Sequence, residues 1–213
     1  MYKNVNTILW DWNGTLLNDR DLCIRSMNRL LSSRNLPFLT TEKYLEVFTF
    51  PVKLYYQKLG FNFQQEAFEI PAEEFITHYS KGLSEVLLFD DVVPSLDFFQ
   101  KKGFRQYIIS AMEHNALRES VKSRGILPYF KEVYGIADNL AHGKISLAEQ
   151  LLKQEKIRSF EALLIGDTQH DVEVAEVLQV QSVLVARGHQ HTSVLQKTGK
   201  PIMESLSYLH DLF

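Results

Sequence analysis

Residues 8–17 read ILWDWNGTLL, the end of an apolar run followed by a polar turn. The run, Val5 to Trp10, does not alternate, which is typical of a strand buried on both faces. It ends at Asp11, and Asn13 and Gly14 follow two and three positions later. Open parallel sheets bind ligands at their carboxyl edge, where this carboxylate would lie. Because Asp and Asn-Gly are also ordinary turn formers, this stretch alone leaves a functional site and a plain turn both open.

The bulk composition favours a small-molecule partner. The chain has 213 residues, a formal net charge of -3 and scattered basic residues, so it has no electrostatic signature of nucleic-acid binding. Its single cysteine, Cys23, permits no internal disulfide and fits a reducing compartment. We find neither a basic region followed by a long apolar run at the N-terminus nor a stretch of membrane-spanning length. We therefore expect a cytoplasmic protein that binds neither membrane nor nucleic acid.

Residues 18–88 have helical periodicity and no convincing strand. Apolar residues recur at helical spacing in four segments: 21–31, 41–48, 51–59 and 72–83. Aromatic side chains are frequent here and suffice for a separate small core. We expect a small all-helical domain formed by residues 18–88.

From residue 89 onward, strand and helix patterns alternate. The predicted strands are 107–109, 133–136, 162–165 and 182–185, and the predicted helices include 92–102, 144–154 and one from Asp171. This alternation predicts a mainly parallel sheet with right-handed crossovers. We therefore predict an α/β fold with a doubly wound parallel sheet, formed by residues 1–17 and 89–213.

Polar residues follow three of these strands: Asp11, Ser110 and the pair Gly166-Asp167. The carboxyl ends of parallel strands lie at one edge of the sheet, so these side chains should converge. Asp171 follows Asp167 by one turn, and Lys144 begins a helix that can reach the same edge. Each has a structural alternative: residues 110–113 (SAME) fit a capping box, Asp171 could cap a helix, and Lys144 could be a solvated surface charge.

Three carboxylates at one edge would repel one another, so a cation should lie among them. A site of carboxylate oxygens suits a hard cation, and Mg²⁺ is the leading choice because it binds a few carboxylates together with substrate phosphate. Lys144 would add positive charge. Ser110 and the backbone amides beside it, at Ala111, could hold a phosphate.

Four motifs in this order resemble those of the haloacid dehalogenase superfamily, specifically its Mg²⁺-dependent, phosphoglycolate phosphatase-like branch. The motifs are 11–16 (DWNGTL), Ser110, Lys144 and 166–171 (GDTQHD). The first and last are specific, and the other two are informative through their order. The resemblance covers nearly the whole chain and implies a Rossmann-like core with residues 18–88 as a cap domain that acts as a lid.

The resemblance also implies roles for these residues. Asp11 would be the nucleophile that becomes an aspartyl-phosphate and would also bind Mg²⁺. The backbone carbonyl of Asn13 and the carboxylates of Asp167 and Asp171 would complete the metal site. Ser110 and Lys144 would hold the phosphoryl group of a small phosphorylated metabolite, in agreement with the demands of phosphoryl transfer.

One position departs from the family pattern. These phosphatases usually have an aspartate two residues after the nucleophile, where it protonates the leaving group, and this chain has Asn13. An amide cannot exchange that proton, and such catalysis typically contributes about 10² to 10⁴ in rate. We expect slow turnover or a bias toward good leaving groups, and an Asn13→Asp variant that turns over faster. His170 or His78 could replace the proton donor, although a surface position is more common for a histidine.

Two other functions stay open. The chain could be a phosphate- or Mg²⁺-binding regulatory protein that has lost turnover through Asn13. It could also cleave phosphonates, with Lys53 as a substrate-binding, Schiff-base lysine. Lys53 belongs to the segment 48–53, which we expect to reach into the site and to contribute to substrate specificity. His189 and His191 suggest a metal pair, but we interpret them as part of a solvated loop.

Overall fold

The computed structural model describes residues 2–137 and 143–213, and its centre is a six-stranded parallel sheet. The strand order is β3-β2-β1-β4-β5-β6. The strands are β1 (Thr7–Trp10), β2 (Arg105–Glu113), β3 (Glu132–Ile136), β4 (Ala162–Gly166), β5 (Gln181–Val185) and β6 (Ile202–Met203). The order reverses at β1, which pairs with β2 on one side and β4 on the other. The predicted doubly wound α/β fold is confirmed.

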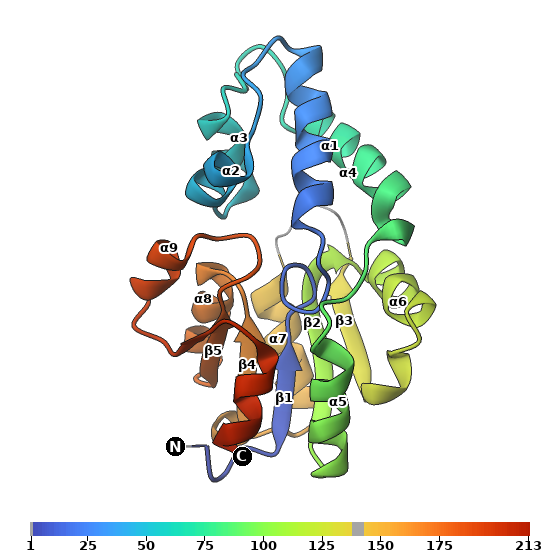
Figure 1. The fold of residues 1–213 in the computed structure, drawn as a ribbon, viewed down its shortest axis with the longest axis vertical. Helices are drawn as coiled ribbons and strands as arrows, with labels where there is room; N and C mark the ends of the chain where they lie inside the picture. The colour runs from blue at the N-terminus through green and yellow to red at the C-terminus, as the bar shows by residue number, and fades with distance from the viewer. Residues whose placement is uncertain (1, 138–142) are drawn as a thin grey trace.

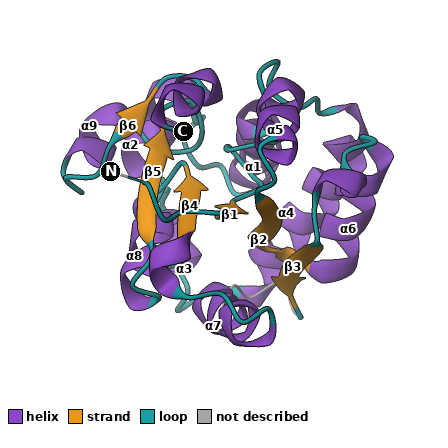
Figure 2. Ribbon diagram, turned by 90° about the horizontal axis from the view of Figure 1, so that it is seen from below, coloured by secondary structure: helices purple, strands orange, loops and turns teal. Residues whose placement is uncertain are grey.

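Helices cover both faces of the sheet (Figure 2). They are α5 (Val92–Lys101), α6 (His114–Ser123), α7 (Lys144–Gln154), α8 (Gln169–Val177) and α9 (Thr192–Gln196). Ile8 and Trp10 of β1 pack in one buried cluster with α5 and α6, while Leu9 packs in another with α7 and α8. Short 3₁₀ helices occupy Leu127–Tyr129, Ser159–Glu161 and Leu206–Leu212. Because both faces are covered, β1 is apolar at consecutive positions and does not alternate.

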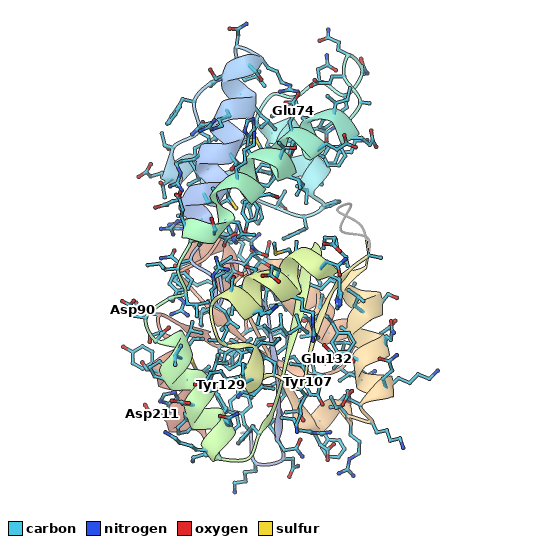
Figure 3. All side chains as sticks on the ribbon, turned by 90° about the vertical axis from the view of Figure 1, so that its right-hand side faces the viewer. Glu74, Asp90, Tyr107, Tyr129, Glu132 and Asp211 are labelled. Atoms are coloured by element: carbon cyan, nitrogen blue, oxygen red, sulfur yellow. The ribbon has the colours of Figure 1, made fainter. Side chains whose placement is uncertain are left out.

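The segment between β1 and α5 forms a helical layer above the sheet in Figure 1. Its helices are α1 (Arg20–Ser33), α2 (Thr41–Val47), α3 (Val52–Lys58) and α4 (Glu69–Gly82), followed by a 3₁₀ turn at Leu83–Glu85. Met27, Leu30, Tyr44 and other residues of this layer form a separate buried cluster. In Figure 3, Glu74 of α4 lies in this layer, and Tyr107 and Glu132 lie in the layer of the sheet. We call residues 18–88 the helical insertion.

The structure corrects the prediction for the strand that contains Ser110. Strand β2 does not stop at Ser110 but continues to Glu113, with an irregular register against β3 between these two residues. Helix α6 is capped instead by Glu113, whose carboxylate accepts hydrogen bonds from the backbone amides of Asn115 and Ala116, both at 2.9 Å. The capping-box interpretation of Ser110 is therefore wrong, because the irregular register carries the chain three residues further before the helix begins.

Among the described residues, no helix has the length and apolar character needed to cross a membrane.

Candidate active site

Three acidic side chains meet at the carboxyl edge of the sheet. Asp11 follows β1, Asp167 follows the adjacent strand β4, and Asp171 lies in the first turn of α8. All three are buried, and one carboxylate oxygen from each lies within 4.8 Å of the others. The sheet places them together because β1 and β4 are paired in parallel, so their last residues are neighbours.

The side chain of Lys144 joins two of these carboxylates. Its ammonium group donates a hydrogen bond to Asp171 Oδ1 at 2.5 Å and another to Asp11 Oδ1. Lys144 is only 4 % exposed and is the first residue of α7. Burial would lower its pKa, but the charges of Asp11 and Asp171 outweigh burial and raise it above the ordinary lysine value. The amine is therefore charged, and it is not the solvated surface lysine of the alternative interpretation.

The carboxylates have shifted pKa values. Burial, together with repulsion from Asp171 and Asp167, raises the pKa of Asp11 to about 8 despite Lys144. Burial also raises the pKa of Asp167, to about 6, against the opposing charge of His189. At Asp171 burial acts in the same direction, but the charge and hydrogen bond of Lys144 outweigh it and lower the pKa. Negative charge at Asp11 and Asp167 is thus only partly compensated by the protein, as expected of a cation site.

Hydrogen bonds fix the orientation of the other two acids. Asp167 Oδ2 accepts from the backbone amide of His189 at 2.6 Å, and Oδ1 accepts from the Thr15 hydroxyl at 3.2 Å. Asp171 Oδ2 accepts from the backbone amide and the hydroxyl of Thr168, at 3.0 and 2.7 Å, in a capping box of α8. Asp171 therefore caps its helix with one oxygen, as the structural alternative predicted, and binds Lys144 with the other.

Asn13 has a fixed amide orientation. Its side-chain nitrogen donates to Asp19 Oδ2 and to the Tyr79 hydroxyl, both at 2.8 Å. Its side-chain oxygen accepts a longer hydrogen bond from the Ser110 hydroxyl at 3.4 Å. Tyr79 belongs to α4, so the helical insertion helps to hold this side chain. The oxygen of the amide, and not its N–H groups, therefore faces Ser110.

Asp19 is a buried residue of this network that the sequence analysis missed. Besides Asn13, its carboxylate accepts from the Tyr79 hydroxyl at 2.8 Å and the Gly14 amide at 3.0 Å, and it pairs with His189 at 3.2 Å. Burial would raise its pKa, but the charge of His189 and these hydrogen bonds lower it below the ordinary value. Directly before α1, Asp19 has the position of a helix cap in the sequence, yet its side chain makes no capping hydrogen bond.

The structure overturns the solvated-loop interpretation for His189 but not for His191. His189 is 4 % exposed, and its ring contacts Asp19 through Nε2 and the Tyr44 hydroxyl through Nδ1, the latter at 2.7 Å. Burial opposes the charged ring, but Asp19 in particular raises its pKa to about 9. His191 is exposed and caps α9 by accepting from the amide of Ser193. The two histidines therefore do not form a pair.

A cavity of about 200 Å³ lies between the sheet edge and the helical insertion. The predicted residues that line it are Asp11, Asn13, Ser110, Ala111, Lys144, Asp167 and Asp171. The insertion contributes Cys23, Tyr44, Phe48, Phe50, Val52, Tyr55, Tyr56, Phe75, Ile76 and Tyr79. Most predicted site residues thus share one cavity with aromatic side chains of the helical insertion, among them Phe48 and Phe50 of the segment 48–53.

Lys53 is the predicted site residue that the structure does not bring to this cavity. It is exposed, and its ammonium group lies 5.5 Å from the ring centroid of Phe63. Of the two histidines considered as proton donors, His170 lines the cavity and stacks on Phe50 at 4.7 Å between ring centroids. His78 is not among the lining residues.

Comparisons with known proteins agree with this arrangement. A family model described as haloacid dehalogenase-like hydrolase matches residues 8–185. The chain is 24% identical over 198 residues to pyrophosphatase PpaX of Anoxybacillus flavithermus, covering 91% of this chain and 90% of that protein. It is 28% identical over 173 residues to a 5'-nucleotidase of Pseudomonas aeruginosa, covering 78% and 75%.

Solved structures share the fold. A haloacid dehalogenase-like family hydrolase from Streptococcus pneumoniae superposes with a TM-score of 0.86 at 19% identity over 99% of both chains. A predicted phosphoglycolate phosphatase from Haemophilus somnus superposes with a TM-score of 0.82 at 16% identity over 98% of both chains.

Proposed function

Because this chain belongs to the haloacid dehalogenase-like hydrolase family, we propose that it is a Mg²⁺-dependent phosphatase of a small phosphorylated metabolite. The observation that carries this proposal is the convergence of Asp11, Asp167 and Asp171 around the ammonium group of Lys144. One relative is named a pyrophosphatase and another a 5'-nucleotidase, so what they have in common is a phosphoryl group and not one metabolite.

The donor set of the acidic cluster fits a magnesium ion. The three carboxylates offer oxygen ligands, and a single ammonium group leaves them with excess negative charge in a buried site. Asp11, Asp167 and the backbone carbonyl of Asn13 would hold the ion, with Asp171 binding directly or through water. Once bound, Mg²⁺ would neutralise charge on the carboxylates and on the phosphoryl group.

We propose that Asp11 is the nucleophile. One of its carboxylate oxygens forms a bond to phosphorus while the ester P–O bond breaks, and the electron pair leaves with the alcohol oxygen. Lys144 and the Ser110 hydroxyl hold the phosphoryl oxygens, and water then cleaves the aspartyl-phosphate to release inorganic phosphate and restore the carboxylate. Holding the reactants in place and stabilising their charge accounts for most of such catalysis.

Asn13 limits this reaction because its amide cannot protonate the departing alcohol. We therefore expect slow turnover of alkyl esters and faster turnover of esters with good leaving groups. The helical insertion would act as a cap that closes over the substrate, since its side chains form most of the cavity wall opposite the acids.

Phosphate release from a panel of phosphate esters tests this proposal. The wild type should release phosphate with Mg²⁺ and not with EDTA, and Asp11→Asn should lower the rate by at least about 10³-fold because the nucleophile is lost. Asp90→Asn, at an exposed acid outside the cavity, is the matched control and should retain full activity. Activity that persists in Asp11→Asn would refute the mechanism.

Asn13 also favours a second function, that of a Mg²⁺- and phosphate-binding regulatory protein. Wild-type protein that binds Mg²⁺ and phosphate but releases none from any ester of the panel would support it. A phosphonate-cleaving function has less support because Lys53 lies outside the cavity. A borohydride-trapping experiment with a phosphonate aldehyde should therefore leave Lys53 unmodified.

A further inference from the structure

We infer that the substrate is a phosphate monoester of a compact, uncharged, largely apolar alcohol or phenol about the size of one six-membered ring. The inference rests on the proposed phosphatase function and concerns the part of the substrate that departs. It comes from the wall of the cavity opposite the acidic cluster, which we call the aromatic wall: Tyr44, Phe48, Phe50, Tyr55, Phe75 and Tyr79.

Four rings of the aromatic wall, those of Tyr44, Phe48, Phe50 and Tyr55, contact one another, and Phe75 and Tyr79 form a separate stacked pair. The ring of Phe48 lies 5.5 Å from that of Phe50 and 5.3 Å from that of Tyr55, both nearly edge to face. Phe50 in turn stacks on His170. These separations are those of favourable aromatic pairs, and a ring of the substrate could join them by the same contacts.

The described lining residues offer no unpaired basic side chain to a second anionic group. Of its described lining residues, only Lys144, His170 and His189 can carry positive charge. Lys144 is bound to two carboxylates, His189 is paired with Asp19, and His170 is paired with Glu173. Residues 138–142, which lie outside the described part of the chain, read DNLAH, so His142 is their only basic side chain. A carboxylate or second phosphate beyond the reacting phosphoryl group would therefore be buried unpaired against aromatic rings, which is strongly unfavourable.

The size of the cavity limits the organic group. It measures about 200 Å³, and it must also hold the phosphoryl group beside Asp11. An apolar cavity of about 150 Å³ in another protein accommodates one benzene molecule. A single ring or an alkyl group of that size therefore fits inside the cavity, whereas a nucleoside would extend out of its open side.

The aromatic wall contains one polar atom without a partner. The Tyr55 hydroxyl is buried and has no hydrogen-bond partner among the described residues. Buried hydroxyl groups are normally paired, so a neutral polar substituent on the substrate ring could accept this hydrogen bond. This second observation points to the same occupant, an uncharged ring with at most a small polar group.

A matched pair of esters tests the inference. Benzyl phosphate and phosphoglycolate share the CH₂–O–PO₃ group and differ only in phenyl versus carboxylate, so both release a primary alcohol. With Mg²⁺ we expect kcat/KM for benzyl phosphate to exceed that for phosphoglycolate by roughly 100-fold, since only the ring can be buried without an unpaired charge. Pyrophosphate, which has a second anionic group, should react as poorly as phosphoglycolate.

Variants of the aromatic wall localise the effect. Phe48→Ala should reduce the preference for benzyl phosphate about tenfold by removing ring contacts, and Phe50→Leu, a milder change, should reduce it less. Leu54→Ala, at an exposed position of α3 outside the cavity, should leave the preference unchanged. Equal preference in wild type and both cavity variants would overturn the inference.

A binding measurement separates this inference from the proposed function. Benzylphosphonate and phosphonoacetate are the corresponding non-hydrolysable pair, and titration calorimetry with Mg²⁺ should find benzylphosphonate bound at least about tenfold more tightly. If benzylphosphonate binds more tightly but no ester is hydrolysed, the proposed phosphatase function is refuted and the inferred apolar ligand is supported. If esters are hydrolysed but phosphonoacetate binds as tightly as benzylphosphonate or more tightly, the inference of an uncharged apolar substrate group is overturned. It is also overturned if neither compound binds.

Discussion

The side-chain nitrogen of Asn13 lies 2.8 Å from a carboxylate oxygen of Asp19, so the residue in the usual acid/base position is a hydrogen-bond donor to a buried acid. The sequence alone led us to expect faster turnover from Asn13→Asp. The structure changes that expectation, because the new carboxylate would face Asp19 where an N–H group now donates. The two acids would repel each other or share a proton, and neither arrangement frees an acid for the leaving group.

We therefore predict that Asn13→Asp alone changes kcat for benzyl phosphate less than about threefold, whereas Asn13→Asp with Asp19→Asn raises it by about 10² through restored acid/base catalysis. Asp19→Asn places an amide beside the new carboxyl group at position 13, so the two positions again pair one amide with one acid. Asn13→Asp with Asp21→Asn, which alters an exposed acid of α1 two residues after Asp19, is the matched control and should behave as the single variant. A single variant as fast as the Asp19→Asn double variant would disprove this coupling.

Magnesium should stabilise the protein more as pH rises. The pKa of Asp11 is raised to about 8 and that of Asp167 to about 6, so protons compete with the ion at these oxygens. We expect the increase in Tm caused by Mg²⁺, measured against EDTA, to grow between about pH 6 and about pH 8.5, with at least about tenfold tighter binding at the higher pH. Asp167→Asn should remove most of this increase. An increase in Tm that is independent of pH would contradict the proposal that Asp11 and Asp167 bind Mg²⁺.

The ion pair of His189 with Asp19 should make stability fall at alkaline pH. The folded-state pKa of His189 is raised to about 9 from 6.5, so its contribution is fully present below about pH 6.5 and is lost as pH rises through about 9. At full strength the contribution is about 3 kcal/mol, an order-of-magnitude value. Urea unfolding in EDTA should show a smaller alkaline loss for His189→Gln than for the wild type. His191→Gln, at an exposed position of the same loop, should behave as the wild type.

The sheet and the acids at its edge could be predicted because local signals determine them. A buried parallel strand is apolar at consecutive positions, and Asp11 and Asp167 follow two such strands directly. Parallel pairing then places the strand ends together whatever the length of chain between them. Lys144 was less predictable, because it begins a helix and does not follow a strand directly, so a solvated surface position stayed open for it.

The partners of Asn13 could not be predicted in this way. Asp19 contacts Tyr79, which is 60 residues away, and His189, which is 170 residues away, and no motif links these positions. Helical periodicity shows which face of a helix is buried but not which neighbour covers it. Lys53 illustrates the same limit: Val52 lines the cavity, but consecutive helical residues point about 100° apart, so Lys53 faces Phe63 instead.

The carboxylate of Asp167 leaves no space for a side chain at Gly188. A Cβ atom added at Gly188 would lie 2.0 Å from Asp167 Oδ2, which no packing allows, although Gly188 is not among the glycines with positive φ. Glycine is therefore required at position 188 because the backbone there passes close to the Asp167 carboxylate, and not because the backbone needs a positive φ. Gly188→Ala should displace this carboxylate and weaken Mg²⁺ binding by at least about tenfold.

Gly103→Ala is the matched control for Gly188→Ala. Gly103 has a φ of 80° and nothing within 4 Å of an added Cβ atom, so alanine there strains the backbone far from the acids. It should lower the free energy of unfolding by about 1 kcal/mol and leave Mg²⁺ affinity unchanged. Titration calorimetry with Mg²⁺ and urea unfolding of both variants separate the two effects. Equal loss of Mg²⁺ affinity in both would show that general destabilisation, and not contact with Asp167, governs the metal site.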